Sequence, residues 1–123
     1  MADAAAGAAT LTPVPARAQE AALALHAAGQ DAKAIRMLRD GTFLSLAHAP
    51  AALAALVRDG SLPTTPEEAA ARLARDDASL HAELCRLLGA GDRDEATRRL
   101  RQATGLDLAN AFLLVKQLAE AAG

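Results

Sequence analysis

The sequence contains no tryptophan or tyrosine, only two phenylalanines, and few β-branched apolar residues, with three valines and one isoleucine among 123 residues. Strands favour β-branched and aromatic side chains, so this shortage argues against a β-sheet. The chain instead holds 35 alanines and 20 leucines, which lose little conformational freedom when they enter a helix. The composition therefore predicts an all-α fold.

The chain also has little cysteine and a small net charge. Cys85 is the single cysteine, so no internal disulfide can form, which favours a reducing compartment. The 13 basic and 15 acidic side chains give a formal charge of −2, which argues against a protein that coats nucleic acid. No run of about 18 strongly apolar residues is present to cross a membrane, and the residues after Met1 do not look like a secretory signal. We therefore expect a cytoplasmic protein with no membrane partner.

Prolines, glycines and capping residues predict where the helices of the first half lie. Residues 1–14 lack helical periodicity, and we expect a disordered tail there. One helix is predicted over 15–28 and a second, short one over 31–40, each ended by a glycine. A third is predicted over 45–57, where Pro50 removes a backbone donor and must cause a kink or a late start.

The second half begins with the clearest local signal. Thr65 and Glu68 spell a capping box with a proline at the first helical position. Asp77 can cap a fresh helix, so two helices are favoured over one long helix between 66 and 88. Further helices are expected after Asp92 or Asp94 and after Asp107. The inner apolar stripe of the last one is predicted to be Leu108, Ala111, Phe112, Val115, Leu118 and Ala122.

The chain resembles itself at a fixed offset. A shift of 62 residues aligns 15–56 with 77–118 and gives 14 identities in 42 positions, against about five expected by chance from so much alanine and leucine. Nine of them are not alanine: Leu25, Gly29, Arg36, Leu38, Arg39, Thr42, Leu44, Leu46 and Leu56 recur as Leu87, Gly91, Arg98, Leu100, Arg101, Thr104, Leu106, Leu108 and Leu118.

This self-similarity predicts two tandem three-helix modules, over residues 15–57 and 77–122, joined by a linker at 58–76 that contains a short helix. Each module is close to the size below which a single core needs a metal, disulfides or a partner for stability. We therefore expect the modules to pack on each other or on another chain.

Two sets of residues are candidates for binding a partner. Stepping 100° per residue places Leu113 opposite the inner stripe of the last helix and Leu114 on its flank. These leucines either contact a partner, pack against the other module, or are merely exposed. The second set comprises the recurring arginines Arg36, Arg39, Arg98 and Arg101, which either meet acidic groups on a partner or form a solvated helix face.

The sequence offers no catalytic or metal site. No nucleophile, base and orienting residue can be assembled. His26, His48 and His81 lack a ligand spacing suited to zinc, and the glycines from Gly89 lack the lysine and hydroxyl of a phosphate-binding loop. We therefore predict a protein that is not an enzyme and has no cofactor or metal.

The segment RDEATRRLRQATGLDLANAFLLV, residues 93–115, resembles the helical hairpin in the C-terminal domain of the bacterial large-subunit ribosomal stalk protein. The likeness rests on Ala96, Arg98, Arg101, Thr104, Gly105, Leu106, Leu108, Ala111 and Val115. The first copy keeps Ala34, Ile35, Arg36, Arg39, Thr42, Leu44, Leu46 and Ala49. In that family the hairpin contacts translational GTPase factors through basic residues and a small apolar surface. The resemblance implies such a role for Arg98 and Arg101, and for Arg36 and Arg39.

These features together predict a small protein-protein interaction module of unassigned role. Leu113 and Leu114 would be its apolar anchor, and the repeated arginines would meet acidic groups on another protein. A second copy of the same chain is also a candidate partner. The alternative is nucleic-acid or ribosome-associated binding through the cluster of Arg98, Arg99 and Arg101, which would depend strongly on salt.

Overall fold

The computed structural model describes the backbone of residues 4–122 and the side chains of residues 7–121. Within this part of the chain there are eight helices and no strand, so the predicted all-α fold is confirmed. The helices are α1 (Ala4–Leu11), α2 (Ala16–Ala27), α3 (Asp31–Arg39), α4 (Ala49–Asp59), α5 (Pro66–Asp76), α6 (Ala78–Gly89), α7 (Arg93–Thr104) and α8 (Leu108–Ala122).

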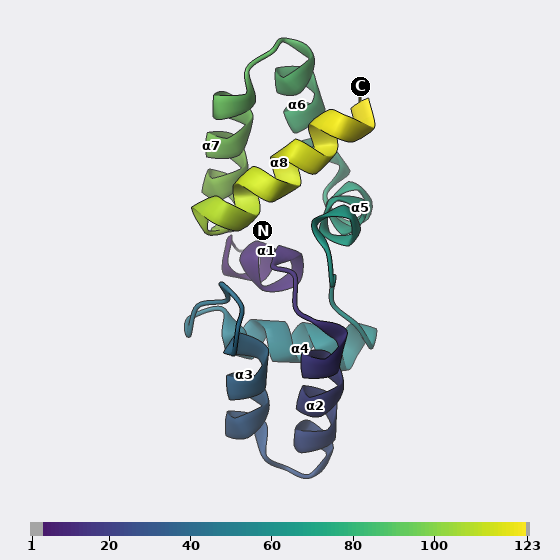
Figure 1. The fold of residues 1–123 in the computed structure, drawn as a ribbon, viewed down its shortest axis with the longest axis vertical. Helices are drawn as coiled ribbons and strands as arrows, with labels where there is room; N and C mark the ends of the chain where they lie inside the picture. Colours follow the sequence, from purple (N-terminus) through teal and green to yellow (C-terminus); the bar gives the residue numbers. More distant parts are fainter. Residues whose placement is uncertain (1–3, 123) are drawn as a thin grey trace.

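The helices form two lobes with two helices between them (Figure 1). The first lobe consists of α2, α3 and α4, and the second lobe of α6, α7 and α8. Helix α1 packs against α4, α5 and α7, while α5 packs against α1, α6 and α8. Each lobe has its own cluster of buried side chains, and α1 contributes to both: Ala9 belongs to the first cluster and Leu11 to the second. The lobes are therefore joined by shared apolar packing.

The predicted helix boundaries of the second half are confirmed. The Thr65 hydroxyl accepts a hydrogen bond from the Glu68 amide at 3.1 Å, and Pro66 is the first residue of α5. Asp77 caps a fresh helix, since its Oδ1 accepts from the Leu80 amide at 3.1 Å. Residues 66–89 are therefore two helices, because this carboxylate satisfies an amide at the start of α6 that the preceding helix cannot.

The helix predicted over residues 45–57 starts late. A late start was one of the two effects predicted for Pro50. Helix α4 begins at Ala49, and Pro50 occupies its first turn. A proline is tolerated there because the first amides of a helix have no intrahelical partner in any case. The residues from Asp40 to His48 consequently remain as a loop outside regular helix.

The prediction of a disordered tail over residues 1–14 is wrong for residues 4–14. These residues form α1 and the turn after it, and Ala8, Ala9, Leu11 and Val14 are at most 4% exposed. The segment has no side-chain periodicity of its own, and its burial between the lobes supplies the stability that an isolated helix of eight residues lacks. Residues 1–3 lie outside the described part of the chain.

The 62-residue repeat recurs in the helix boundaries. Shifting the bounds of α2, residues 16–27, by 62 gives 78–89, which are the bounds of α6. Helix α1 contacts α4, and α5 contacts α8. The segment at 58–76, expected to be a linker with a short helix, thus contains in α5 the counterpart of α1. The bounds of the other helix pairs do not coincide at both ends, so the arrangement as two tandem modules stays a prediction.

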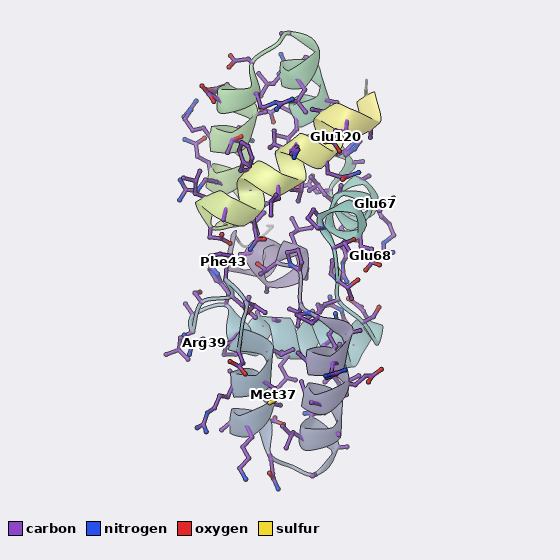
Figure 2. All side chains as sticks on the ribbon, viewed as in Figure 1. Met37, Arg39, Phe43, Glu67, Glu68 and Glu120 are labelled. Atoms are coloured by element: carbon purple, nitrogen blue, oxygen red, sulfur yellow. The ribbon has the colours of Figure 1, made fainter. Side chains whose placement is uncertain are left out.

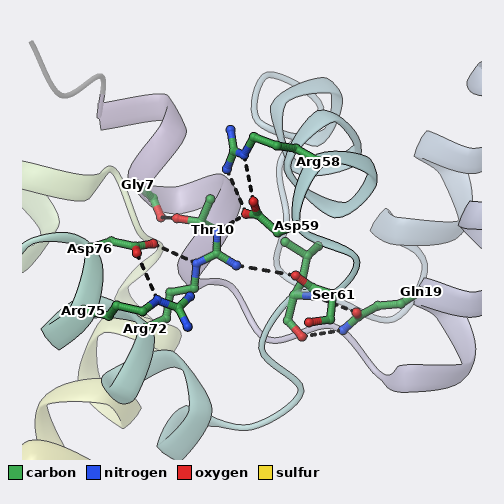
Figure 3. Close-up of polar contacts among 10 residues, drawn as sticks. Gly7, Thr10, Gln19, Arg58, Asp59, Ser61, Arg72, Arg75 and Asp76 are labelled. Atoms are coloured by element: carbon green, nitrogen blue, oxygen red, sulfur yellow. Dashed lines mark hydrogen bonds and ion pairs between the residues drawn. The ribbon is translucent and has the colours of Figure 1, made fainter.

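Polar contacts hold the connector between α4 and α5 in place (Figure 3). Gln19 is 5% exposed and donates its side-chain amide to the carbonyls of Val14 at 2.8 Å and Leu62 at 2.9 Å. Its Oε1 accepts from the Leu62 amide at 2.8 Å. The side-chain amide is thus fully used, which meets the requirement that a buried polar group be hydrogen-bonded.

Candidate functional site

An open groove of about 540 Å³ lies between α7 and α8 on the second lobe. It combines two arginines with two apolar side chains that are about half exposed. The lining residues are Asp94, Thr97, Arg98, Arg101, Gln102, Gly105, Leu106, Leu108 and Phe112. A concave surface that carries both charge and unpaired apolar area is the kind of place where a partner segment can dock.

The turn between α7 and α8 fixes the shape of the groove. Helix α7 ends at Gly105, whose φ of +75° is one that residues with a Cβ rarely adopt. The Thr104 hydroxyl donates to the Leu100 carbonyl at 2.7 Å and accepts from the Leu106 amide at 3.2 Å. The chain then enters α8 under a cap from Asp107, whose Oδ2 accepts from the Asn110 amide at 3.0 Å. Local hydrogen bonds therefore set the angle between the two helices.

The two arginines of the groove are held in different ways. Arg101 donates its Nε hydrogen to the Leu106 carbonyl at 3.3 Å, which fixes the guanidinium beside the turn. Arg98 makes two hydrogen bonds to Glu95, one of them from Nε to Oε2 at 2.9 Å. These hydrogen bonds lower the pKa of Glu95 and raise the pKa of Arg98. Both arginines are exposed, so their remaining N–H groups face solvent.

The apolar part of the groove comes from the first turns of α8. Leu108 is 59% exposed and Phe112 is 48% exposed. Both were predicted to lie on the inner stripe of this helix, and that part of the prediction is wrong. The buried arc of α8 is centred on Ala111, Leu114 and Leu118, because α8 packs on α5 and α6 as well as on α7. The two side chains are left at the edge, one turn apart and facing the groove.

The two leucines predicted to anchor a partner, Leu113 and Leu114, differ in their exposure. Leu114 is 2% exposed and belongs to the buried cluster of the second lobe, so its prediction as a partner-binding residue is wrong. Leu113 is 41% exposed, as predicted, but it does not line the groove. The angular position of each residue on the helix correctly placed Leu113 on the exposed face. It wrongly placed the neighbouring Leu114 at the border of that face.

The four recurring arginines are all exposed, but they do not meet in one site. Arg98 and Arg101 line the groove of the second lobe, while Arg36 and Arg39 lie on α3 of the first lobe. Arg99 points away from the groove, since its Nε is 2.9 Å from Oε1 of Glu83 on α6. The cluster proposed for nucleic-acid binding is therefore split between two faces of α7.

Sequence reasoning missed Leu108 and Phe112 as groove residues. Their spacing of four is a signal for one helix face, but the same signal is expected of core positions. Only the packing of α5 and α6 against α8 decides which stripe is buried. The remaining clue was the alignment of Leu108 with Leu46, which marks a position that is exposed in both lobes.

No group of three histidine, cysteine, aspartate or glutamate side chains arranged to hold a metal ion occurs within residues 7–121. None of the helices described between residues 4 and 122 combines the length and apolarity needed to span a bilayer. Comparisons with protein-family models, with curated proteins and with solved structures gave no match to this chain.

Proposed function

We propose that this chain is a non-enzymatic protein-interaction module that docks an acidic, apolar segment of a partner protein in the α7–α8 groove. The observation that carries the proposal is the convergence of Arg98 and Arg101 with the exposed side chains of Leu108 and Phe112 in one concave surface. The lone Cys85 suits a reducing compartment, so we assign this activity to the cytoplasm.

The apolar pair supplies most of the binding free energy. Fully burying a leucine or phenylalanine side chain stabilises by about 1.5–3 kcal/mol, and these two side chains have about half of that area left to bury. Exposed ion pairs contribute about 0–1 kcal/mol each. The arginines therefore act mainly on specificity and association rate, by favouring acidic partners over basic ones.

Nucleic-acid binding through Arg98, Arg99 and Arg101 has less support. Arg99 is paired with Glu83 and points away from the groove. Only two arginines, Arg98 and Arg101, line the groove, and Arg98 also pairs with Glu95. A phosphate backbone requires several cations along one path. The resemblance of this hairpin to the ribosomal stalk family, whose hairpin contacts protein factors, also favours a protein partner.

The test uses a fluorescent synthetic peptide in which Asp-Asp and Phe-Leu pairs alternate, and a counterpart with Lys-Lys in place of Asp-Asp. Fluorescence anisotropy measures its binding to the wild-type chain and to the double variant Leu108→Ser with Phe112→Ser. We expect the variant to bind the acidic peptide about tenfold more weakly or worse, because both apolar contacts are lost.

The matched control is Val57→Ser, which removes a side chain of similar exposure, 43%, from the first lobe. It should bind as the wild type does. Equal binding of the acidic and basic peptides, or unchanged binding by the double variant, would refute the proposal. Retention of a single-stranded oligonucleotide that is lost in Arg99→Gln would instead support the nucleic-acid alternative.

A further inference from the structure

Three hydrogen bonds of the turn between α7 and α8 recur in the loop after α3. Arg39 donates its Nε hydrogen to the Leu44 carbonyl at 3.4 Å, as Arg101 does to Leu106. The Thr42 hydroxyl donates to the Leu38 carbonyl at 2.8 Å and accepts from the Leu44 amide at 3.3 Å, which matches the two bonds of Thr104. These three hydrogen bonds therefore recur at equivalent positions of the repeat. The helix ends differ, because α3 stops at Arg39 while α7 continues to Thr104, and Phe43 stands at the position of Gly105.

The loop after α3 carries two exposed apolar side chains. Phe43 and Leu46 are each 65% exposed, the highest values among the large apolar side chains described. Leu46 occupies the position of Leu108 in the repeat. Figure 2 shows Phe43 and Arg39 on the same side of the molecule, at the loop that leaves α3. An aromatic and a leucine side chain thus lie beside a cationic helix end.

Helix α3 carries unpaired positive charge at this place. Lys33, Arg36 and Arg39 are all exposed and follow one another at intervals of three residues. Lys33 stands where the second lobe has Glu95, so Arg36 lacks the carboxylate that neutralises Arg98. Among the side chains described, no acidic group lies within ion-pair distance of Lys33 or Arg36. Like charges at this spacing repel each other, so an anionic group from outside the chain is favoured.

We propose that the surface formed by Lys33, Arg36, Arg39, Phe43 and Leu46 is a second docking surface, and that it takes an acidic segment with apolar side chains from a partner protein. The choice of this segment rests on the proposed function of the α7–α8 groove. In Figure 1, α3 and the loop that follows it lie below α1, while α7 and the start of α8 lie above it. One chain therefore holds two partner segments.

A peptide suits this surface better than a nucleic acid does. Asp40 is exposed at the end of α3, where the second lobe has the neutral Gln102. It repels a continuous phosphate chain, and the net charge of −2 acts in the same direction. A peptide can place its carboxylates against Lys33 and Arg36 and leave a gap at Asp40. Its apolar side chains then cover Phe43 and Leu46.

The experiment counts binding sites by isothermal titration calorimetry with the alternating Asp-Asp and Phe-Leu peptide. We expect two peptides per wild-type chain. The double variant Phe43→Ser with Leu46→Ser should bind one, and so should Leu108→Ser with Phe112→Ser. The one peptide left on the Leu108 and Phe112 variant should show the steeper salt dependence, because Arg36 has no neutralising partner among the side chains described. All four side chains are largely exposed, and an unchanged circular dichroism melting curve checks that each variant folds.

The outcomes separate this inference from the proposed function. One peptide per wild-type chain, unaffected by the Phe43 and Leu46 variant and lost in the Leu108 and Phe112 variant, would overturn the second surface and leave the groove intact. No binding to the wild type would overturn both. A third outcome is that an oligonucleotide binds the wild type, that Arg36→Gln abolishes this binding, and that the peptide does not bind the surface around Arg36. It would assign this surface to nucleic acid and refute the inference.

Discussion

Arg72 on α5 lies against Asp59, the last residue of α4, with Nη2 at 2.5 Å from Oδ2. The arginine side chain is only 8% exposed. Its Nε also donates to Asp76 at 2.9 Å, and Nη1 donates to the Ser61 carbonyl at 3.4 Å. One buried guanidinium therefore connects the end of the first lobe, the connector and the middle helix (Figure 3).

Replacing Arg72 with methionine should destabilise the protein. The methionine keeps much of the buried apolar stem but loses the three hydrogen bonds, so the free energy of unfolding should fall by about 1–3 kcal/mol. Arg75→Met is the matched control, because the Arg75 side chain is 70% exposed and, among the side chains described, pairs only with Asp76. Urea denaturation should place this control at the wild-type value. Equal effects of the two substitutions would contradict the role of Arg72.

The carboxylates around Arg72 predict how stability depends on pH. Hydrogen bonds from Arg58 and then from Arg72 hold the pKa of Asp59 well below its ordinary value of 3.8. Burial alone would raise the pKa of Asp76, but the hydrogen bonds from Arg72 and Arg75 outweigh it and the pKa is lowered. Because the folded pKa is the lower one, the contribution to stability is present above the unfolded pKa and is lost as the pH falls towards the folded value.

We therefore expect stability to change little between about pH 7 and pH 5 and to fall steadily below about pH 4. Asp59→Asn should reduce stability at neutral pH, and the difference from the wild type should shrink as the pH falls. Thermal unfolding followed by circular dichroism at several pH values measures this. A constant difference across the whole range would show that the Asp59 charge does not contribute.

Gly7 lies where α1 closely approaches the end of α7. A Cβ placed on Gly7 would lie 2.9 Å from the Cα of Thr104, a distance at which the backbone has to move. Gly7→Ala should therefore destabilise by about 1–3 kcal/mol through overpacking, in spite of the better helix propensity of alanine. The matched control is Gly89→Ala on α6, where no described atom outside the local helix backbone lies within 4 Å of the added Cβ.

The control should be neutral or stabilise by up to about 1 kcal/mol. Amide hydrogen exchange distinguishes the two, because only the Gly7 variant should lose protection at residues 8–11. Equal protection in both variants would mean that α1 does not depend on its contact with α7.

Replacing either of two adjacent leucines on α8 with alanine should change stability by very different amounts. Leu114→Ala should lower the free energy of unfolding by about 2–5 kcal/mol, because it opens a cavity in the buried cluster. Leu113→Ala should leave stability within about 0.5 kcal/mol of the wild type, as expected for an exposed side chain. Guanidinium denaturation measures both. A similar loss in the two variants would contradict the orientation of the helix.

The helix boundaries of this chain follow closely from local chemistry. The caps at Thr65, Asp77 and Asp107 and the terminal Gly105 each act within about four residues, so the sequence contains all the information that they need. The repeat could be recognised in the sequence for the same reason, because the residues that begin and end its helices act locally.

The location of α1 and the buried face of α8 depend instead on contacts distant in sequence. Residues 4–11 contain only alanine, glycine, threonine and leucine, and their burial arises from packing on α4, α5 and α7. Leu114 is buried because α8 contacts three helices rather than one. Extending the 62-residue alignment towards the N-terminus would have paired residues 4–11 with 66–73, which is the one sequence signal for this helix.

The candidate groove could also be predicted from the sequence only in part. The exposure of Arg98 and Arg101 could be predicted because polar residues on one face of a helix are expected to face solvent. The apolar half of the groove could not be predicted, since Leu108 and Phe112 have the spacing of core residues. Only the position of α8 against α7 leaves them at the surface.

The central claim is that the α7–α8 groove is a docking site for an acidic, apolar segment. Its most direct test is an NMR titration of the isotope-labelled chain with the alternating Asp-Asp and Phe-Leu peptide, followed at each backbone amide. The claim predicts saturable shifts at Thr97, Arg101, Leu108 and Phe112 that are absent with the Lys-Lys peptide. Shifts confined to residues around Leu113, or no saturable shift at these four amides, would contradict it.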